Sequence, residues 1–330
     1  MRSITIKIAM TFLILPLIVF VSSSGVAQCP DTSTRGHLNV MTLNLLFSEV
    51  KDRELRLERI ADFVAQQARL APPEPVDVIL LNEVVGGFLS KTFNSSHDLK
   101  QLLAQRGLNY FLSFRLANGL PGILSVGNAI LSRCEIAFTL SVNLPFVTEE
   151  PFQGLMIPLK RNAMMSRIKI PGFGKINVYN THLCAFCDPS DRLEQALVLA
   201  DFIEDVENFV LGENPMILGG DFNTDLSLPE DFPAYNLITQ QLGFTDTYRA
   251  VNPDCTSCCS STYGYAGCTF AVPPNPYAFD LFTHQPEIPA RIDYIFTKGT
   301  QLTPIESSVK FNVDPNWVSD HSAVLTRIGL

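Results

Sequence analysis

Residues 215–223 read PMILGGDFN, and this stretch joins an apolar strand to a pair of polar residues. PMILGGD (215–221) is a short apolar run of the length expected for a buried strand. The run ends in Asp221, and Asn223 follows two residues later. Carboxylates are rarely buried unless they are paired or bind a metal. The stretch therefore predicts a functional site at the end of a buried strand.

Other apolar runs along the chain also end in polar residues. These residues are Asn44 in HLNVMTLNLL (37–46), Glu83 in VDVILLNEV (76–84) and His182 in KINVYNTHL (175–183). Two later segments add Asp293 inside RIDYIF (291–296), and Asp320 and His321 just before AVLTRI (323–328). Each residue alone could be a solvated strand end or a satisfied hydrogen bond in the core. Together they supply oxygen ligands for a hard divalent cation, histidines that titrate near neutral pH, and carboxylates to orient them.

The chain lacks the sequence signatures of several other catalytic sites. It has no GxSxG nucleophile elbow and no Walker or GxGxxG loop. We therefore expect the nucleophile to be water activated near a metal ion.

Helical patterns alternate with the apolar runs. Residues 51–69 place Leu57, Ile60 and Val64 on one face. A second helix is expected to begin at Asp188-Pro189, with the aspartate as cap and the proline at the first helical position. Further strands are expected at 127–132, 166–170, 291–297 and 323–328. This mixture over the whole length predicts one α/β or α+β domain.

The order N…E…NTH…GDFN…RIDY…SDH resembles the endonuclease/exonuclease/phosphatase superfamily, the metal-dependent phosphoesterases related to DNase I. The resemblance covers roughly residues 37–330. It implies an α/β/β/α sandwich of four layers, in which two mixed sheets lie face to face with helices outside. The active site would lie at the edge where the strand ends converge.

The resemblance also implies a role for each polar residue. Glu83 matches the main Mg²⁺ ligand, with Asn44 beside it, and Mn²⁺, Co²⁺ or Ca²⁺ are the alternative ions. His321 matches the general base and Asp293 the carboxylate that orients its ring. The remaining residues would bind or position the phosphoryl group, the attacking water, the leaving group or the metal: His182, Asp221, Asn223 and Asp320.

One segment indicates the substrate. GCTFAVPPNPYAF (267–279), followed by PARIDYIF (289–296), resembles the neutral sphingomyelinases, which release phosphocholine from sphingomyelin. Thr269, Pro273 and Asn275 match their Thr-x-x-x-Pro-x-Asn pattern; the alternative is a proline-rich connection without a special role. The partner would then be a phospholipid or sphingolipid headgroup, met transiently at a membrane surface by a monomeric enzyme.

Residues 141–160 are expected to form a loop broken by prolines, either exposed to lipid or folded onto the core. No long aromatic hairpin of the bacterial sphingomyelinase kind is evident in the sequence.

The main alternative is a secreted DNase I-like endonuclease acting on nucleic acid. The net charge of −9 makes the chain as a whole a poor partner for nucleic acid, although a local basic groove can outweigh the average. Candidate basic residues for such a groove, Arg115, Arg133 and Arg249, are scattered. An inositol-phosphate phosphatase and a catalytically silent binding module are further alternatives.

The first 27 residues predict a cleaved signal peptide and a secreted, extracellular or periplasmic, protein. Arg2 and Lys7 precede a largely apolar run at 8–21, and the small residues Gly25 and Ala27 follow it. The run is shorter than the about 20 residues that span a bilayer, although an uncleaved anchor is the alternative. The catalytic domain would comprise residues 28–330 and contain no transmembrane helix.

The 8 cysteines of the chain then favour disulfides, as expected in an oxidising compartment. The sequence does not determine which cysteines pair; a local Cys184–Cys187 bridge and a stapled 255–268 loop are two arrangements that it allows. The alternative is zinc, because Cys184-x-x-Cys187 and Cys255-x-x-Cys258 are both CxxC pairs.

Overall fold

The computed structural model describes residues 29, 35–48, 52–152, 155–210, 214–254, 258–279 and 285–330, without the side chains of 147–152 and 155–157. The predicted signal peptide and Cys255 lie outside these residues. The described strands are β1 (His37–Asn44), β2 (Val78–Gly86), β3 (Phe111–Leu120), β4 (Leu124–Ser132), β5 (Ile136–Phe152), β6 (Leu155–Ile170), β7 (Gly174–His182), β8 (Met216–Asp221), β9 (Thr245–Asp246), β10 (Asp293–Lys298), β11 (Thr303–Lys310) and β12 (Ala323–Gly329).

The helices lie between and after these strands. They are α2 (Arg53–Ala68), α3 (Ser95–Gln105), α4 (Pro189–Val210), α5 (Phe232–Asn236) and α6 (Thr247–Val251), with short turns η1 (Phe88–Ser90), η2 (Pro229–Asp231), η3 (Leu237–Gln241) and η4 (Ser261–Tyr263). Among the described residues, no helix is both long and apolar enough to cross a membrane.

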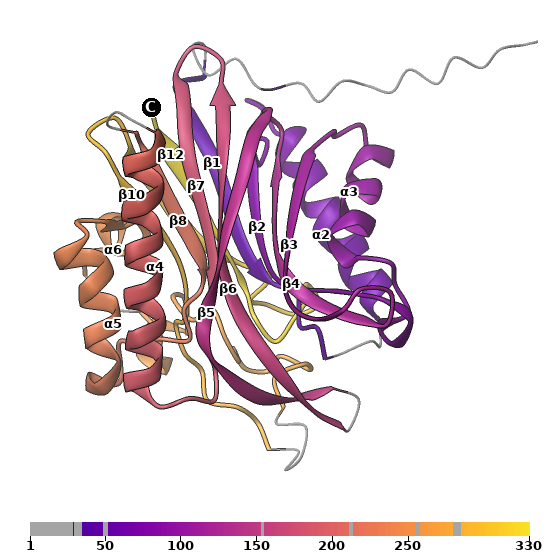
Figure 1. The fold of residues 1–330 in the computed structure, drawn as a ribbon. Helices are drawn as coiled ribbons and strands as arrows, with labels where there is room; N and C mark the ends of the chain where they lie inside the picture. Colours follow the sequence, from indigo (N-terminus) through magenta and orange to yellow (C-terminus); the bar gives the residue numbers. More distant parts are fainter. Residues whose placement is uncertain are drawn as a thin grey trace, which may run out of the picture.

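The described strands form two sheets that lie face to face (Figure 1). One has the order β11-β12-β1-β2-β4-β3 and the other the order β5-β6-β7-β8-β10-β9. Each sheet contains one parallel pair, β1–β2 and β7–β8, and the remaining neighbours are antiparallel. Parallel neighbours need a crossover, and α2 and α4 supply it. The carboxyl ends of β1 and β2, and of β7 and β8, therefore lie next to each other within each sheet.

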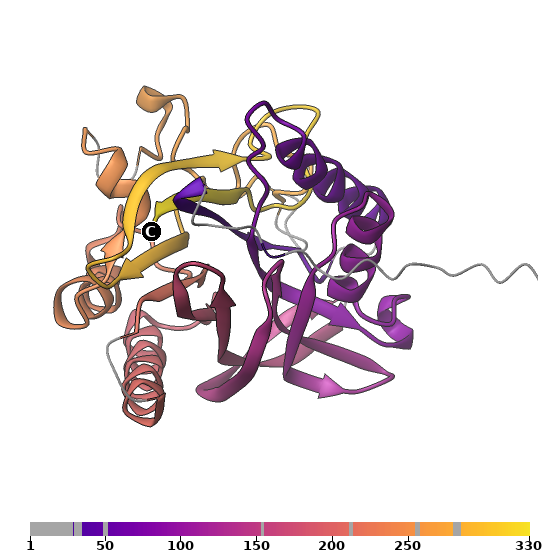
Figure 2. The same ribbon diagram turned by 90° about the horizontal axis from the view of Figure 1, so that it is seen from above.

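Three apolar cores hold the layers together. One core fills the space between the sheets and contains Leu38, Val40 and Ile217. A second core, with Met41 and Leu43, lies between the first sheet and α2 and α3. The third packs α4 and α5 against the second sheet. Figure 2 shows these helices on the two outer sides. The predicted four-layer sandwich is therefore confirmed, and the central strands β1, β2, β7 and β8 are mostly buried because both faces of the sheets are covered.

The expectation for residues 141–160 is wrong. Instead of a loop, β5 and β6 form a long antiparallel hairpin, from Ile136↔Ile168 to Phe152↔Leu155. The strand pairing continues past Pro145, because the register shifts between Asn143 and Val147. Phe146, within this irregularity, has a φ of 66°. Figure 1 shows the hairpin continuing past the ends of β7 and β8. The side chains of Phe152, Leu155, Met156 and Ile157 lie outside the described residues.

The cysteines form disulfides. Cys29 is bonded to Cys134, Cys184 to Cys187, and Cys259 to Cys268, and Cys258 is also disulfide-bonded. The predicted local 184–187 bridge is therefore present. Zinc binding by Cys184 and Cys187 is excluded while they are bonded to each other, because zinc needs thiolates.

Candidate active site

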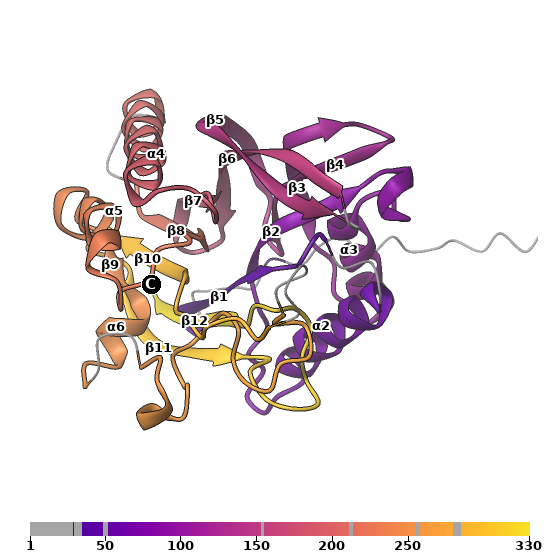
Figure 3. The same cartoon turned by 90° about the horizontal axis from the view of Figure 1, so that it is seen from below.

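Five strands deliver polar side chains to one edge of the sandwich. In the second sheet, His182 at the end of β7 pairs with Asp221 at the end of β8, and Asp221 pairs with Asp293 at the start of β10. In the first sheet, Asn44 pairs with Asn82, which precedes Glu83. Figure 3 views the molecule from this end.

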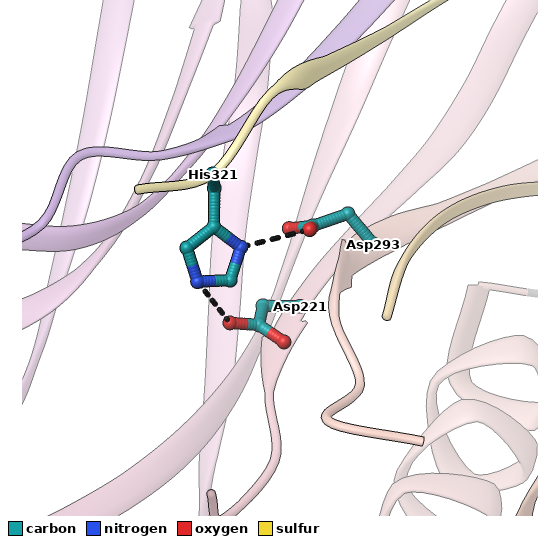
Figure 4. Close-up of side chains that lie close together, drawn as sticks. All are labelled: Asp221, Asp293 and His321. Atoms are coloured by element: carbon teal, nitrogen blue, oxygen red, sulfur yellow. Dashed lines mark hydrogen bonds and ion pairs between the residues drawn. The ribbon is translucent and has the colours of Figure 1, made fainter. Parts of the chain in front are cut away.

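Asp221, Asp293 and His321 form the centre of the site (Figure 4). His321 Nδ1 lies 2.8 Å from Asp293 Oδ2, and His321 Nε2 lies 3.7 Å from Asp221 Oδ2. All three residues are buried. The ring of His321 is thus held between two carboxylates, one on each nitrogen.

The short distances between these buried side chains shift the pKa values of Asp221 and His321. Burial and the neighbouring Asp293 carboxylate raise the pKa of Asp221 to about 7. For His321, burial opposes the charged imidazolium, but the carboxylates of Asp293, Asp221 and Asp320 outweigh it. The pKa of His321 is therefore raised well above its usual value. The site is built to hold positive charge beside two carboxylates.

His182 has the opposite character. Its Nε2 lies 3.4 Å from Asp221 Oδ2, and its Nδ1 lies 3.2 Å from Nη1 of the buried Arg161. A guanidinium can only donate, so Nδ1 must accept and the ring proton must sit on Nε2. Burial and the charges of Arg161 and His321 lower the pKa of His182 well below its usual value. His182 is therefore a neutral hydrogen-bond donor directed at Asp221.

The two predicted metal ligands are tied to neighbouring groups. Asn44 Nδ2 donates to Asp221 Oδ2 at 3.0 Å, and Asn44 Oδ1 accepts from the Leu46 amide. Glu83 Oε2 accepts from the Phe47 amide at 2.7 Å, and Glu83 has a φ of 54°. Asn44 thus contacts the central group, whereas Glu83 stands outside the set of ligand atoms that lie within 4.8 Å of one another.

Asn223 and Asp320 both shape turns next to the centre. The Asn223 amide donates to Asp221 Oδ1 at 2.9 Å, and its side chain donates to the Leu183 carbonyl. Asp320 Oδ1 accepts from Ser319 Oγ and from the His321 amide. These bonds hold Asp221 and His321 in place, and they leave Asp320 outside the central group.

The segment with the sphingomyelinase-like pattern packs directly on the site. Thr269 Oγ1 accepts from the backbone amides of Ile292 and Asp293, at 3.1 and 3.0 Å. Asn275 Nδ2 donates to the Ser319 carbonyl at 2.8 Å. Thr269 and Asn275 therefore fix the backbone that carries Asp293 and His321.

Buried side-chain amides join the two sheets beneath the site, and they were not predicted from the sequence. Asn82 Oδ1 accepts from the Asp221 amide, and Asn82 Nδ2 donates to Asn180 Oδ1 and Asn128 Oδ1. Arg161 was also missed as a partner of His182. A buried amide in an apolar strand was the available signal, since Asn82 precedes Glu83 and Asn180 lies two residues before His182.

The donor set fits a divalent cation. Asp293 Oδ1 is buried without a hydrogen-bond partner among the described residues. Together with the raised pKa of Asp221, this leaves two buried carboxylates whose repulsion a cation would relieve. Carboxylate and amide oxygens are the ligands of a hard ion such as Mg²⁺.

The comparisons with known proteins agree with this geometry. The Endonuclease/Exonuclease/phosphatase family profile matches residues 41–321. No curated protein sequence matches the chain. An endonuclease/exonuclease/phosphatase from Beutenbergia cavernae is 24% identical with a TM-score of 0.62, and the match covers 90% of this chain and 72% of that one.

Two further solved structures have the same fold at lower identity. A mannosyl-6-phosphatase from Bacteroides thetaiotaomicron is 19% identical with a TM-score of 0.58, and the match covers 89% of this chain and 100% of that one. TDP2 from D. rerio, complexed with a single-strand DNA product, is 16% identical with a TM-score of 0.61, over 89% and 99% of the two chains. Because the family profile spans most of the sequence, the chain belongs to the endonuclease/exonuclease/phosphatase family of metal-dependent phosphoester hydrolases.

Proposed function

We propose that the chain is a secreted Mg²⁺-dependent phosphodiesterase that cleaves sphingomyelin, releasing phosphocholine. In this proposal residues 1–27 are a signal peptide and residues 28–330 are the catalytic domain. The observation that carries the substrate assignment is the set of hydrogen bonds by which Thr269 and Asn275 contact the backbone beside the site. These two residues belong to the sphingomyelinase-like pattern, and they hold the backbone of Asp293 and the 319–321 turn.

The chemistry follows from the positions of the side chains. In the state with Nε2 unprotonated, His321 takes a proton from the attacking water at this nitrogen, and Asp293 stabilises the resulting imidazolium by accepting from Nδ1. His182 donates a hydrogen bond from its Nε2–H to a phosphoryl oxygen or to the leaving oxygen, and it keeps its proton. Asp221 and Asn223 orient the water and the scissile phosphate.

The carboxylate of Glu83 and the side chain of Asn44 would hold the metal next to Asp221. When bound, a divalent cation neutralises charge on the phosphoryl oxygens and weakens the pull of Asp221 on the His321 proton.

The scattered arginines support a lipid substrate over nucleic acid. Arg115 Nη2 donates to the Thr139 carbonyl at 2.9 Å, and Arg249 Nη1 donates to the Tyr235 hydroxyl at 3.2 Å. Arg133 Nη1 lies 3.7 Å from Asp77 Oδ1. Asp77 directly precedes β2, so it lies at the end of this strand opposite to Glu83. A nuclease needs several free cations beside its site to bind successive phosphates. These three arginines are engaged within the fold instead.

The test is phosphocholine release from sphingomyelin vesicles by the protein without residues 1–27, in Mg²⁺ and in EDTA. Plasmid DNA is incubated in the same buffer. We expect release in Mg²⁺, none in EDTA and intact plasmid. Nicked plasmid without phosphocholine would move the substrate to nucleic acid and contradict the proposal.

His321→Ala and Glu83→Gln test the assigned roles. Each is expected to lower the rate by at least about a hundredfold, the usual effect of losing a general base or a metal ligand. Near-normal turnover by either variant would contradict its role. Arg167→Met is the control, because Arg167 of β6 is also a buried polar residue but donates to Asn177 and Asn214, away from the site.

A further inference from the structure

We propose that two hydrogen-bonded turns at the active-site end dock the protein on the surface of a lipid bilayer. The turns are residues 86–93, between β2 and α3, and residues 119–124, between β3 and β4; together they are called the two-turn platform. This inference deepens the proposed function and rests on it. It names a membrane-contacting surface other than the 141–160 segment.

The platform presents large apolar side chains to solvent. Phe88 is 83% exposed and Phe93 is 87% exposed, and they lie within one short connection. Leu120 and Ile123 in the other turn are 65% and 52% exposed, and Leu89 is also exposed. Exposed apolar groups that gather in this way mark an interaction site rather than ordinary surface.

The two turns form one firmly held unit. The Phe88 amide donates to the Gly122 carbonyl at 3.0 Å, and the Leu89 amide donates to the Ile123 carbonyl at 2.9 Å. The guanidinium of Arg53, a buried residue of α2, donates a hydrogen bond to the Ser90 carbonyl. The apolar side chains are therefore held outward by the backbone and do not depend on a flexible loop.

The platform lies at the same end of the molecule as the site. Glu83 and Phe88 are five residues apart, so their backbones are at most about 18 Å apart. β4 starts beside the end of β2, with Gly86 paired to Ser125, and the β3–β4 turn is visible at this end in Figures 1 and 3. Other exposed apolar side chains follow β7 or precede β10 at this end: Phe186, Phe279 and Ile288. A bilayer touching the platform would thus face the opening of the site.

The charge of the platform suits a phospholipid surface. Its fourteen residues contain one cation, Lys91, and no acidic residue, in a chain of net charge −9. Lys91 is exposed between Phe88 and Phe93, where its ammonium can reach headgroup phosphates while the rings enter the acyl boundary. A rigid apolar tip with one cation is the pattern of an interfacial anchor.

The experiment measures vesicle binding apart from catalysis. Every described element lies in residues 29–330, so the chain from residue 28 onward is mixed with sphingomyelin–phosphatidylcholine vesicles in EDTA and floated on a density gradient. We compare wild type, Phe88→Ser/Phe93→Ser, Leu120→Ser/Ile123→Ser and the matched control Phe209→Ser. Phe209 is 72% exposed near the end of α4, at the opposite end of the sandwich.

We expect both platform variants to bind vesicles at least about tenfold more weakly than wild type, and Phe209→Ser to bind as wild type does. All four proteins should hydrolyse a water-soluble phosphocholine ester equally, which shows that the variants are folded. Equal vesicle binding by wild type and both platform variants, or no binding by wild type, would overturn the inference. Self-association that the platform variants abolish, without vesicle binding, would assign the surface to a second copy and also overturn it.

The outcome separates this inference from the proposed function. Vesicle binding that depends on the platform, without phosphocholine release in Mg²⁺, would support the docking surface and contradict the sphingomyelinase assignment. The platform variants could instead bind vesicles and release phosphocholine as wild type does. That result would support the sphingomyelinase assignment and contradict the docking surface.

Discussion

Arg161 determines which nitrogen of His182 faces the site. Its guanidinium donates to Nδ1, so the proton of the neutral ring is held on Nε2 beside Asp221. Without this partner both tautomers are available, and the lowered pKa of His182 loses one of its causes. Arg161 is thus a positioning residue that acts through His182.

We predict that Arg161→Met lowers kcat by about tenfold or more, because hydrogen bonds to charged groups contribute about 1.5–3 kcal/mol. The pKa of His182, followed by NMR, should rise toward its usual value. Arg161→Lys should restore part of the rate, since lysine keeps the charge and a donor. An unchanged His182 titration in Arg161→Met would contradict the assignment, and Arg167→Met controls for the loss of a buried arginine from β6.

The raised pKa of Asp221 predicts how the metal-free protein responds to pH. Between about pH 4 and 7 the folded chain keeps the Asp221 proton that the unfolded chain releases. The folded state therefore binds more protons than the unfolded state in this pH range. The free energy of unfolding then falls as pH rises through it. His321 acts in the same direction, because its raised pKa gives stability that is present at low pH and lost as pH rises.

Asp221→Asn should therefore flatten this pH dependence. We expect the variant in EDTA to be more stable than wild type at pH 8, by up to about 4 kcal/mol, and similar to it near pH 4. Chemical denaturation at the two pH values measures the difference. Added Mg²⁺ should stabilise wild type more than the variant. A variant with the wild-type slope between pH 4 and 8 would show that Asp221 is not the group responsible.

At the scale of the elements, predictions from the sequence were best where strands are buried on both faces. β1, β2, β7 and β8 are almost fully buried strands with polar residues at or near their ends, and each was placed within about three residues. Their ends carry the site because parallel neighbours place their carboxyl ends together. The chemistry-bearing residues were therefore identified before their contacts were known.

The elements that were missed have weaker or conflicting sequence signals. α3, β3, β9 and β11 lack a long periodic pattern, and β5 carries Pro145 and Pro151, which argue against a strand. β5 lies at the edge of its sheet, where proline is tolerated. The contacts between Arg161 and His182 or between Thr269 and Asp293 join distant parts of the chain. Local sequence patterns carry no information about such pairs.

Gly220 shows how tightly β8 must lie against β7. It has a φ of +129°, and a Cβ there would meet the Thr181 carbonyl oxygen at 2.0 Å. We predict that Gly220→Ala destabilises the protein by more than about 3 kcal/mol and displaces Asp221, with loss of activity in the protein that remains folded. Gly243→Ala is the control, because Gly243 also has a positive φ, +72°, but has open space around it. Equal denaturation midpoints for the two variants would show that the strand contact is not tight.

At the scale of the whole molecule, one disulfide joins parts that are distant in sequence and another closes a short local loop. Cys29 and Cys134 are 105 residues apart in sequence, and Cys134 is buried in the core between the sheets. This bond fixes the amino-terminal end of the described chain to the connection between β4 and β5. Cys184 and Cys187, in contrast, close a bond over a separation of only 3 residues, directly after His182.

The chain-entropy effect of a disulfide grows with the length of the loop that it closes. It predicts about 4.7 kcal/mol for the Cys29–Cys134 bond and about 2 kcal/mol for the Cys184–Cys187 bond. We therefore expect Cys29→Ser/Cys134→Ser to lower the free energy of unfolding by roughly twice as much as Cys184→Ser/Cys187→Ser, measured by urea denaturation without reductant. Strong reductant should destabilise wild type at least as much as the first variant. Equal losses in the two variants would mean that loop closure is not the source of the stability, and eight freely titrating thiols in the native protein would contradict the disulfides themselves.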